Sequence, residues 1–341
     1  MSEISVTKLT DKVSGKSINV VDLIALFQRP MFTKTAIAAP AFRVVDSAIV
    51  VNGTIAVTVG DAVVTAKDGA KLDMPTLNDG TDYAIYATKG GLVISANFTA
   101  PPHGYTVETS RQIGGFHYQD DFINEYSIWD LKYKPNVDDP RGMVRTVGGF
   151  WADIYLLNAT PDLLGTSAYN TMIADSVNRP KVPVAWGGDG TEQYSKFTPY
   201  IATEVLAAFG KRLPNQHEFQ VLAQGSKEGY SAVTDPVNTK FDVDARSMVG
   251  CEQVSGHMWQ WGAEHWDRGD GSTGYNWYGV ETDGKGKVKT AGIKGVGCSR
   301  FGGYYGDSNT SGSRSSDWSY EPWTSVSISA ARGICDHHQQ I

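Results

Sequence analysis

The sequence predicts a β-rich α+β protein, and three observations support this fold class. The 341 residues include 37 glycines and 16 tyrosines, a composition that favours strands and turns over long helices. Short segments rich in β-branched residues follow one another between residues 35 and 129, and Gly, Asn and Asp separate them. Helical periodicity is restricted to a few short segments. We therefore expect a strand-rich scaffold followed by a second domain of mixed structure.

Residues 1–34 differ from the rest of the chain. Within them, Val20, Leu23, Ile24 and Phe27 follow the i, i+3, i+4, i+7 spacing of a short amphipathic helix. A helix this short needs a partner surface to be stable in water. We interpret residues 1–34 as a docking segment, and packing on the same chain is the alternative.

Residues 35–132 are predicted to form a β-sandwich. The segments "AFRVV", "SAIVV", "TIAVTV", "AVVTA", "DYAIYA" and "LVISA" are strand-like and closely spaced, which favours a sandwich over alternating strands and helices. No catalytic constellation occurs there, so this region is interpreted as a scaffold.

The second domain spans residues 133–341. "FWADIYLL" is typical of a strand or a buried apolar run, and "PYIATEVLAAFG" and "PNQHEFQVLAQ" predict two helices, with Gly210 as the stop signal of the first. After Gly225 the chain is dominated by Gly, Ser, Asp, Trp and Tyr. Such a long loop-rich stretch in a compact domain indicates a functional region.

Composition excludes several classes of function. The net charge is −7 and no block of Lys and Arg occurs, so we expect no nucleic-acid partner. No apolar run is long enough for membrane insertion, and the N-terminus lacks the apolar core of a secretory signal. Cys251, Cys298 and Cys335 lie far apart, which predicts buried free thiols rather than a disulfide framework. No Cys/His spacing suits zinc, and we expect no cofactor.

Several motifs carry a resemblance to known families. "GKRLPNQHEFQVLA" and "SGHMWQWGAEHW", followed by "RFGGYY" and "AARGICDH", resemble the formylglycine-generating-enzyme branch of the C-type lectin fold. "NFTAPPHGYT", "INEYSIWDLKYKP", "GKRLPN" and "ARGICDH" are more closely similar to the phage major tropism determinant family. This second resemblance extends from Gly80 to Asp336, with the motifs in the same order.

The resemblance implies a β-sandwich joined to a C-type lectin domain, assembled as a homotrimer at the distal tail fibre of a virion. Its function would be to bind a host-cell surface receptor, either protein or glycan. The N-terminal β-prism of the family is replaced here by residues 1–34. We therefore assign these residues to attachment to the tail fibre or the baseplate.

The resemblance also implies that residues 302–333 form a variable-type, receptor-facing region that a diversity-generating retroelement diversifies. Counting back from the shared "ARG-C-DH" ending assigns receptor binding to eleven positions: Tyr304, Gly306, Ser308, Thr310, Asp317, Ser319, Tyr320, Thr324, Val326, Ile328 and Ser329. All eleven residues are of types that can arise by changing the adenines of an AAC codon. Trp318, Glu321 and Trp323 stand between these positions.

The composition of this region gives an independent physical reason for binding. Tyr supplies amphipathic contact area at low entropic cost, and Ser, Gly and Asn supply adaptable hydrogen bonds, as in antibody binding loops. If the stretch is extended, positions 304, 306, 308 and 310 point to one face. We expect Trp318, Arg314 and Arg332 to hold the backbone. Tyr304, Asp317 and Tyr320 are expected to make contacts.

Three other functions fit the sequence less well than receptor binding. A formylglycine-generating oxidase needs two reactive cysteines shortly after the "RFGGYY" position, whereas Cys298 precedes it and Cys335 lies beyond the variable-type region. "EPW" at 321–323 lacks the Asn that calcium-dependent sugar binding would use, so a calcium-independent carbohydrate-binding lectin module stays open. His217 and Glu218 lie inside the fold signature and form no H-E-x-x-H motif. We expect no enzyme and assign no metal ligands, and a structural metal ion held by the turn-like segments "DGKGK", "DRGDGS" or "GGDG" stays open.

Overall fold

The computed structural model describes residues 8–10, 17–19, 31–267, 269, 272, 274–278, 288–291 and 295–339. The chain divides into two compact units. Unit 1 comprises residues 1–75 and 83–114, and unit 2 comprises residues 76–82 and 115–341. The predicted boundary between residues 132 and 133 therefore falls inside unit 2.

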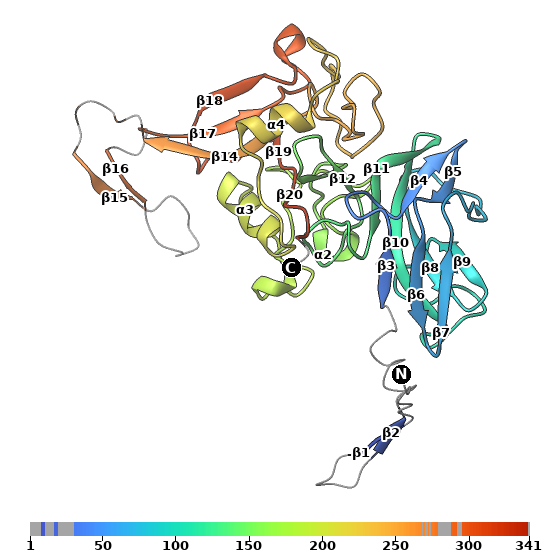
Figure 1. Ribbon diagram of the computed structural model, residues 1–341. Helices are drawn as coiled ribbons and strands as arrows, with labels where there is room; N and C mark the ends of the chain where they lie inside the picture. Colours follow the sequence, from blue (N-terminus) through green and yellow to red (C-terminus); the bar gives the residue numbers. More distant parts are fainter. Residues whose placement is uncertain are drawn as a thin grey trace, which may run out of the picture. The chain divides into compact units, whose positions relative to one another are not determined.

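Residues 32–130 form a succession of strands (Figure 1). They are β3 (Phe32–Lys34), β4 (Phe42–Val45), β5 (Ala48–Val51), β6 (Ile55–Val59), β7 (Ala62–Ala66), β8 (Thr81–Thr88), β9 (Gly91–Ser95), β10 (Ser110–Gln119) and β11 (Phe122–Asp130). Their sheets have the orders β3-β6-β7, β4-β5 and β11-β10-β8-β9. In β6, Ile55, Val57 and Val59 are buried and the residues between them are half-buried, which is the period-2 pattern of a strand with one core face. The predicted strands are confirmed.

The predicted end of the docking segment at residue 34 is wrong. Residues 32–34 form β3, in which Phe32 pairs with Val57 of β6 and is itself buried. Burial of this phenylalanine in a paired strand ties residues 32–34 to unit 1. Further upstream, β1 (Lys8–Thr10) pairs with β2 (Ser17–Asn19) in an antiparallel hairpin. The helix predicted over residues 19–27 lies, beyond Asn19, outside the described residues.

Unit 2 contains three more sheets, with the orders β12-β13-β20, β18-β17-β14-β19 and β15-β16. Their strands are β12 (Met143–Arg145), β13 (Trp151–Asp153), β14 (Trp259–Asp267), β15 (Asn276–Tyr278), β16 (Val288–Thr290), β17 (Val296–Phe301), β18 (Ser316–Tyr320), β19 (Ser329–Ala330) and β20 (Ile334–Cys335). Strand β19 runs parallel to β14, whereas the other paired strands of these sheets whose register is given are antiparallel. The C-terminal strand β20 thus closes back onto β13.

Among the described residues, the helices lie in unit 2 and are short: α2 (Pro161–Leu164), η1 (Val184–Trp186), α3 (Pro199–Ala207), α4 (Gln216–Leu222) and η3 (Ser308–Thr310). Helix α4 begins with a reciprocal capping box between Asn215 and Glu218, so Glu218 has the predicted structural role. Gly210 lies beyond the end of α3 with φ +70°, which suits glycine. The two helices predicted here are confirmed, and α3 and α4 lie beside the β14–β17 sheet (Figure 1).

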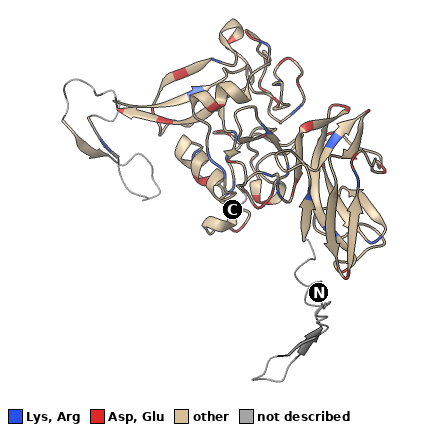
Figure 2. Cartoon of the chain, viewed as in Figure 1, with Lys and Arg blue, Asp and Glu red and all other residues tan. Residues whose placement is uncertain are grey.

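The core of unit 2 consists of adjacent apolar clusters. One contains Tyr155, Phe219 and Phe301, and another contains Leu206 and Trp261. Acidic and basic residues are distributed over many elements rather than gathered on one (Figure 2). Within the described residues, no helix combines the length and apolarity needed to cross a bilayer.

Candidate functional site

The eleven predicted contact positions lie on two segments that follow β17 in the chain. The turn segment is defined as residues 302–312, and the strand segment as residues 316–329, which begins with β18. The turn segment starts at Gly302 and Gly303, with φ of +93° and +81°. A Cβ on Gly302 would lie 2.5 Å from the Val254 carbonyl oxygen. Only glycine fits this close approach without a shift of the backbone.

Backbone hydrogen bonds fix the turn segment. The amide of Gly312 donates to the Gly302 carbonyl at 3.2 Å, and the amide of Tyr305 donates to the His257 carbonyl at 3.1 Å. Residues 308–310 form η3, so the expected extended alternation of positions 304, 306, 308 and 310 is wrong. Nevertheless, Gly306, Ser308 and Thr310 are exposed, because the compact turn projects from the unit.

Tyr304 is half-buried at the base of the turn segment. Its backbone amide donates to a carboxylate oxygen of Asp307 at 2.9 Å, and its ring meets Tyr305 edge-on with 5.0 Å between centroids. Tyr305 in turn packs against the core residues Ile173 and Met258. Tyr304 therefore stands on a ring that the core holds in place.

A polar support lies beneath the turn segment. The Asp242 carboxylate accepts from Tyr230 Oη at 2.6 Å and pairs with His257 Nε2 at 2.8 Å. Burial alone would raise the pKa of Asp242, but the hydrogen bonds from His257 and Tyr230 outweigh it and lower the pKa to about 2. Because the His257 backbone also bonds Tyr305, this support is connected to the turn segment.

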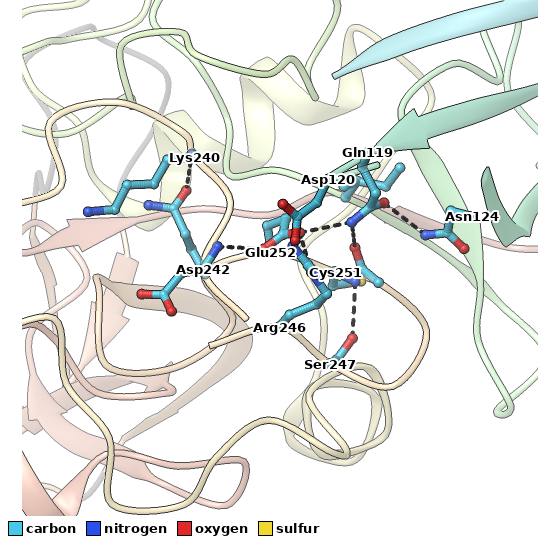
Figure 3. A network of polar contacts seen from close by, with 12 residues as sticks. Gln119, Asp120, Asn124, Lys240, Asp242, Arg246, Ser247, Cys251 and Glu252 are labelled. Atoms are coloured by element: carbon cyan, nitrogen blue, oxygen red, sulfur yellow. Dashed lines mark hydrogen bonds and ion pairs between the residues drawn. The ribbon is translucent and has the colours of Figure 1, made fainter. Parts of the chain in front are cut away.

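Figure 3 shows the network that extends from this support to Glu252. The fully buried Glu252 carboxylate accepts from Gln119 Nε2 at 2.8 Å, from Arg246 Nε at 2.5 Å and from the Asp242 amide at 3.1 Å. Burial raises the pKa of Glu252, and the charge of Arg246 opposes that shift. The network cross-links loops that are distant in sequence, and so makes the base of the site rigid.

The strand segment starts with an irregular pairing. Cys298 of β17 pairs with Tyr320 of β18, and Arg300 pairs with Asp317, so the single residue between them on β17 lies opposite two residues of β18. A bulge of one extra residue reverses the side-chain alternation. Trp318 therefore packs with the cluster of Phe301, whereas Tyr320 packs with the cluster of Cys298.

Trp318 has the predicted scaffold role. Its ring lies 5.0 Å from that of Trp266 and meets Phe301 edge-on at 6.3 Å. Ser319, the next residue, is exposed, and Thr324, Val326 and Ile328 are half-buried. One prediction fails: Ser329 is fully buried in β19, where its Oγ accepts from Arg300 Nη1 at 2.8 Å. A side chain enclosed in this way is not available to a receptor.

The two predicted arginine anchors differ. Arg332 is fully buried, and its guanidinium donates to the Gln260 side chain and to the carbonyls of Asp153, Ile154 and Glu252 at 2.5–2.9 Å. Arg314 is exposed, and among the described residues its guanidinium has no hydrogen-bond or ion-pair partner. The expectation for Arg332 is confirmed and that for Arg314 is wrong, since an anchor requires buried acceptors.

Arg300 is a second buried arginine anchor, which was not predicted from the sequence. Arg300 is 1% exposed in the fully buried strand β17 and forms an ion pair with Asp317. The arginine within the strand-like segment "VGCSRF" could have indicated this anchor, because a buried charge requires a partner. The second missed element is the pair of Asp242 and His257, which only the fold brings together.

Catalysis or metal binding would depend on the cysteine, histidine and acidic side chains. All three cysteines are buried and free, as predicted, and burial raises the pKa of the Cys298 thiol to about 12. His217 is exposed, while His257 is enclosed by Asp242 and Gln253. Among the described residues no group of three or more His, Cys, Asp or Glu side chains is arranged to hold a metal ion.

Known proteins resemble this chain over nearly its full length. Residues 31–128 match the family described as "Mtd second domain". The tail fiber receptor-binding protein of Bordetella phage BPP-1 is 39% identical over 329 residues, which are 90% of this chain and 82% of that protein. Solved structures of the Major Tropism Determinant M1 and U1 variants are each 37% identical and align with TM-scores of 0.84 and 0.82, covering 95% of this chain and 89% of theirs.

These matches agree with the β-rich architecture and its few helices. Their sequence identities of 37–39% are well above the range in which two proteins share only a fold. The chain belongs to the major tropism determinant family of phage tail-fibre receptor-binding proteins.

Proposed function

We propose that this phage tail-fibre protein binds a host-cell surface receptor through the outer side of its turn and strand segments. One observation carries the proposal. Gly306, Ser308, Thr310 and Ser319 are exposed, whereas Arg332 and the Gly302–Gly303 pair are buried beneath them. Adaptable residues therefore cover a rigid base, which is the arrangement expected of a binding surface.

The receptor would be a protein or a glycan. Tyr304 offers a ring for stacking or apolar contact, and the neighbouring hydroxyls and backbone groups offer hydrogen bonds. Tyrosine is common at interface hot spots. The half-buried Val326 and Ile328 add apolar area at the edge of the same segment.

Assembly and attachment extend this proposal. A homotrimer at the distal tail fibre would present several copies of the surface, and a virion would multiply them, so that weak single sites bind tightly together. Residues 1–31 would attach the protein to the fibre or the baseplate. The second domain would have the C-type lectin fold without enzymatic activity, since its thiols are buried.

We also infer that a retroelement diversifies the segment 302–333. The compact backbone of the turn segment supports this inference, because its hydrogen bonds do not depend on the exposed side chains. The genomic test is a nearby reverse-transcriptase gene with a near-copy of this coding segment that differs only at adenines. A near-copy that differed equally at all four bases would contradict the inference.

The functional test places lysines on the exposed positions. In the variant Ser308→Lys/Thr310→Lys/Ser319→Lys, long charged side chains cover the surface without entering the core. We expect at least a tenfold loss of adsorption to intact cells of the strain on which the phage is propagated, about 1.4 kcal/mol. The melting temperature and the oligomer mass should remain those of the parent.

The control is Val63→Lys, at an exposed position of β7 in unit 1. It adds the same side chain outside the candidate surface and should adsorb like the parent protein. Equal adsorption of the triple variant and the parent would overturn the proposed surface. Protease or periodate treatment of the cells then distinguishes a protein receptor from a glycan.

A further inference from the structure

We propose that Arg300 is a positioning residue that joins three of the candidate contact positions, 317, 320 and 329, into one coupled unit. This inference rests on the proposed function, because it concerns the same surface. It changes the role of Asp317 from a direct receptor contact to a clamp that acts through Arg300.

The geometry places a single guanidinium at the centre of three positions. Arg300 Nη2 pairs with an oxygen of Asp317, and Nη1 donates to Ser329 Oγ at 2.8 Å. Its Cζ lies 3.5 Å from the centroid of the Tyr320 ring. The strand segment thus contacts Arg300 at two positions near its start, 317 and 320, and at its last residue, 329.

The walls of this site make the guanidinium hard to move. Arg300 is 1% exposed, and the rings of Trp259 and Trp261 lie 5.2 and 5.6 Å from its Cζ. Its Nε is buried and has no hydrogen-bond partner among the described residues. A buried cation with incomplete hydrogen bonding depends strongly on the partners that it does have.

Asp317 is the carboxylate partner of that cation. Within the described part of the chain, no other acidic side chain forms an ion pair with Arg300. The second carboxylate oxygen of Asp317 accepts hydrogen bonds from the amide and the hydroxyl of Ser319 at 2.9 and 2.7 Å. Both oxygens are therefore engaged inside the protein, and the side chain is only 22% exposed.

This arrangement predicts how the three positions interact. Neutralising position 317 leaves Arg300 without a counter-ion, so the guanidinium moves and the Tyr320 ring loses its cationic neighbour. A change at 317 should then alter the presentation of Tyr320 to the receptor. Positions 308 and 310 have no contact with Arg300 and should vary independently.

A double-mutant cycle tests the coupling, with adsorption to intact cells of the propagation strain as the measurement. Asp317→Asn keeps the shape of the side chain and removes its charge, and we expect about tenfold weaker adsorption. In a Tyr320→Ala background, the same Asp317→Asn change should cost less than about threefold, because the residue that Asp317 positions is gone. Asp317→Glu retains the carboxylate and should restore adsorption to within about threefold of the parent.

A second measurement is independent of the receptor. Nitration of Tyr320 by tetranitromethane, followed by peptide mass spectrometry, reports the exposure of its ring. We expect faster nitration of Tyr320 in Asp317→Asn and in Arg300→Lys, which retains a charge but loses the planar fork. Tyr304 serves as the internal reference and should react at an unchanged rate.

The outcomes separate this inference from the proposed function. If the losses from Asp317→Asn and Tyr320→Ala simply multiply while Tyr320 nitration is unchanged, Asp317 touches the receptor directly and the positioning role is refuted. If neither Tyr320→Ala nor the lysine variant described above weakens adsorption, the surface itself is wrong. A smaller cost of Asp317→Asn in the Tyr320→Ala background than in the parent, together with faster nitration of Tyr320, supports the role of Arg300.

Discussion

The turn segment and the strand segment of the candidate surface are held by different means. In the turn segment, main-chain hydrogen bonds such as Gly312 to Gly302 define the shape. In the strand segment, side chains hold one another through Arg300. The first arrangement tolerates changes of side chain, whereas the second makes the effect of one change depend on another.

This difference bears on how a binding surface can vary without losing its fold. Main-chain hydrogen bonds persist whatever residue stands at an exposed position, so positions 306, 308 and 310 would contribute to receptor binding independently of one another. A buried guanidinium requires its partners, so positions 317, 320 and 329 are constrained together. The surface thus combines an independent part with a coupled part.

The largest effect is expected at Arg332, which is fully buried beneath both segments. Arg332→Met removes the donor to three buried carbonyls and to the Gln260 side chain, each of which costs about 1–3 kcal/mol when left unsatisfied. Chemical denaturation should show a loss of several kcal/mol in the free energy of unfolding. The control Arg314→Met alters an exposed arginine and should change it by less than about 0.5 kcal/mol. Equal effects of the two changes would mean that Arg332 does not support the surface.

A smaller and more local effect should follow from breaking the turn segment alone. Gly302→Ala imposes a left-handed conformation on alanine and brings its Cβ to 2.5 Å from the Val254 carbonyl oxygen. We expect a loss of about 2–4 kcal/mol, measured by thermal and chemical unfolding.

Its control lies in the same segment. In Gly306→Ala the new methyl group meets only the end of the Tyr304 side chain, which can move, so the cost should be below about 1 kcal/mol. Comparable losses for Gly302→Ala and Gly306→Ala would contradict a backbone-defined turn.

The support beneath the turn segment should be sensitive to acid. The pKa of Asp242 is lowered from 3.8 to about 2, so its stabilising effect is fully present above pH 3.8 and is lost as the pH falls through about 2. Asp242→Asn should therefore cost about 1–2 kcal/mol at pH 7. The free energy of unfolding of the Asp242→Asn variant should also fall less steeply than that of the parent protein between pH 4 and pH 2. Parallel pH profiles would show that Asp242 has no special role.

The smallest effect is expected at an exposed position of the turn segment. Thr310→Ala removes a hydroxyl that donates to the Asp307 carbonyl at 2.8 Å in an exposed setting. The free energy of unfolding should change by less than about 0.5 kcal/mol, as differential scanning calorimetry would show. A loss above 1 kcal/mol would mean that side chains as well as backbone hold this segment.

Local patterns were sufficient for the regular elements. Alternating Ile55, Val57 and Val59 predicted β6, and the cap formed by Asn215 and Glu218 accompanies the predicted helix α4. These signals depend on neighbours within a few residues, so the sequence displays them directly. The boundary at residue 34 failed because β3 is only three residues long and depends on its pairing with β6.

The sequence by itself determined the strand-rich architecture, the two helices after residue 199 and a C-terminal segment rich in Tyr, Ser and Gly. The tertiary structure decided which of those residues face outward. The bulge in β18 sends Trp318 and Tyr320 to opposite faces, and a parallel pairing with β14 buries Ser329 against Arg300. The physical reason is that a bulge and a long-range pairing depend on partner strands, and a buried charge selects its neighbours only after the chain has folded.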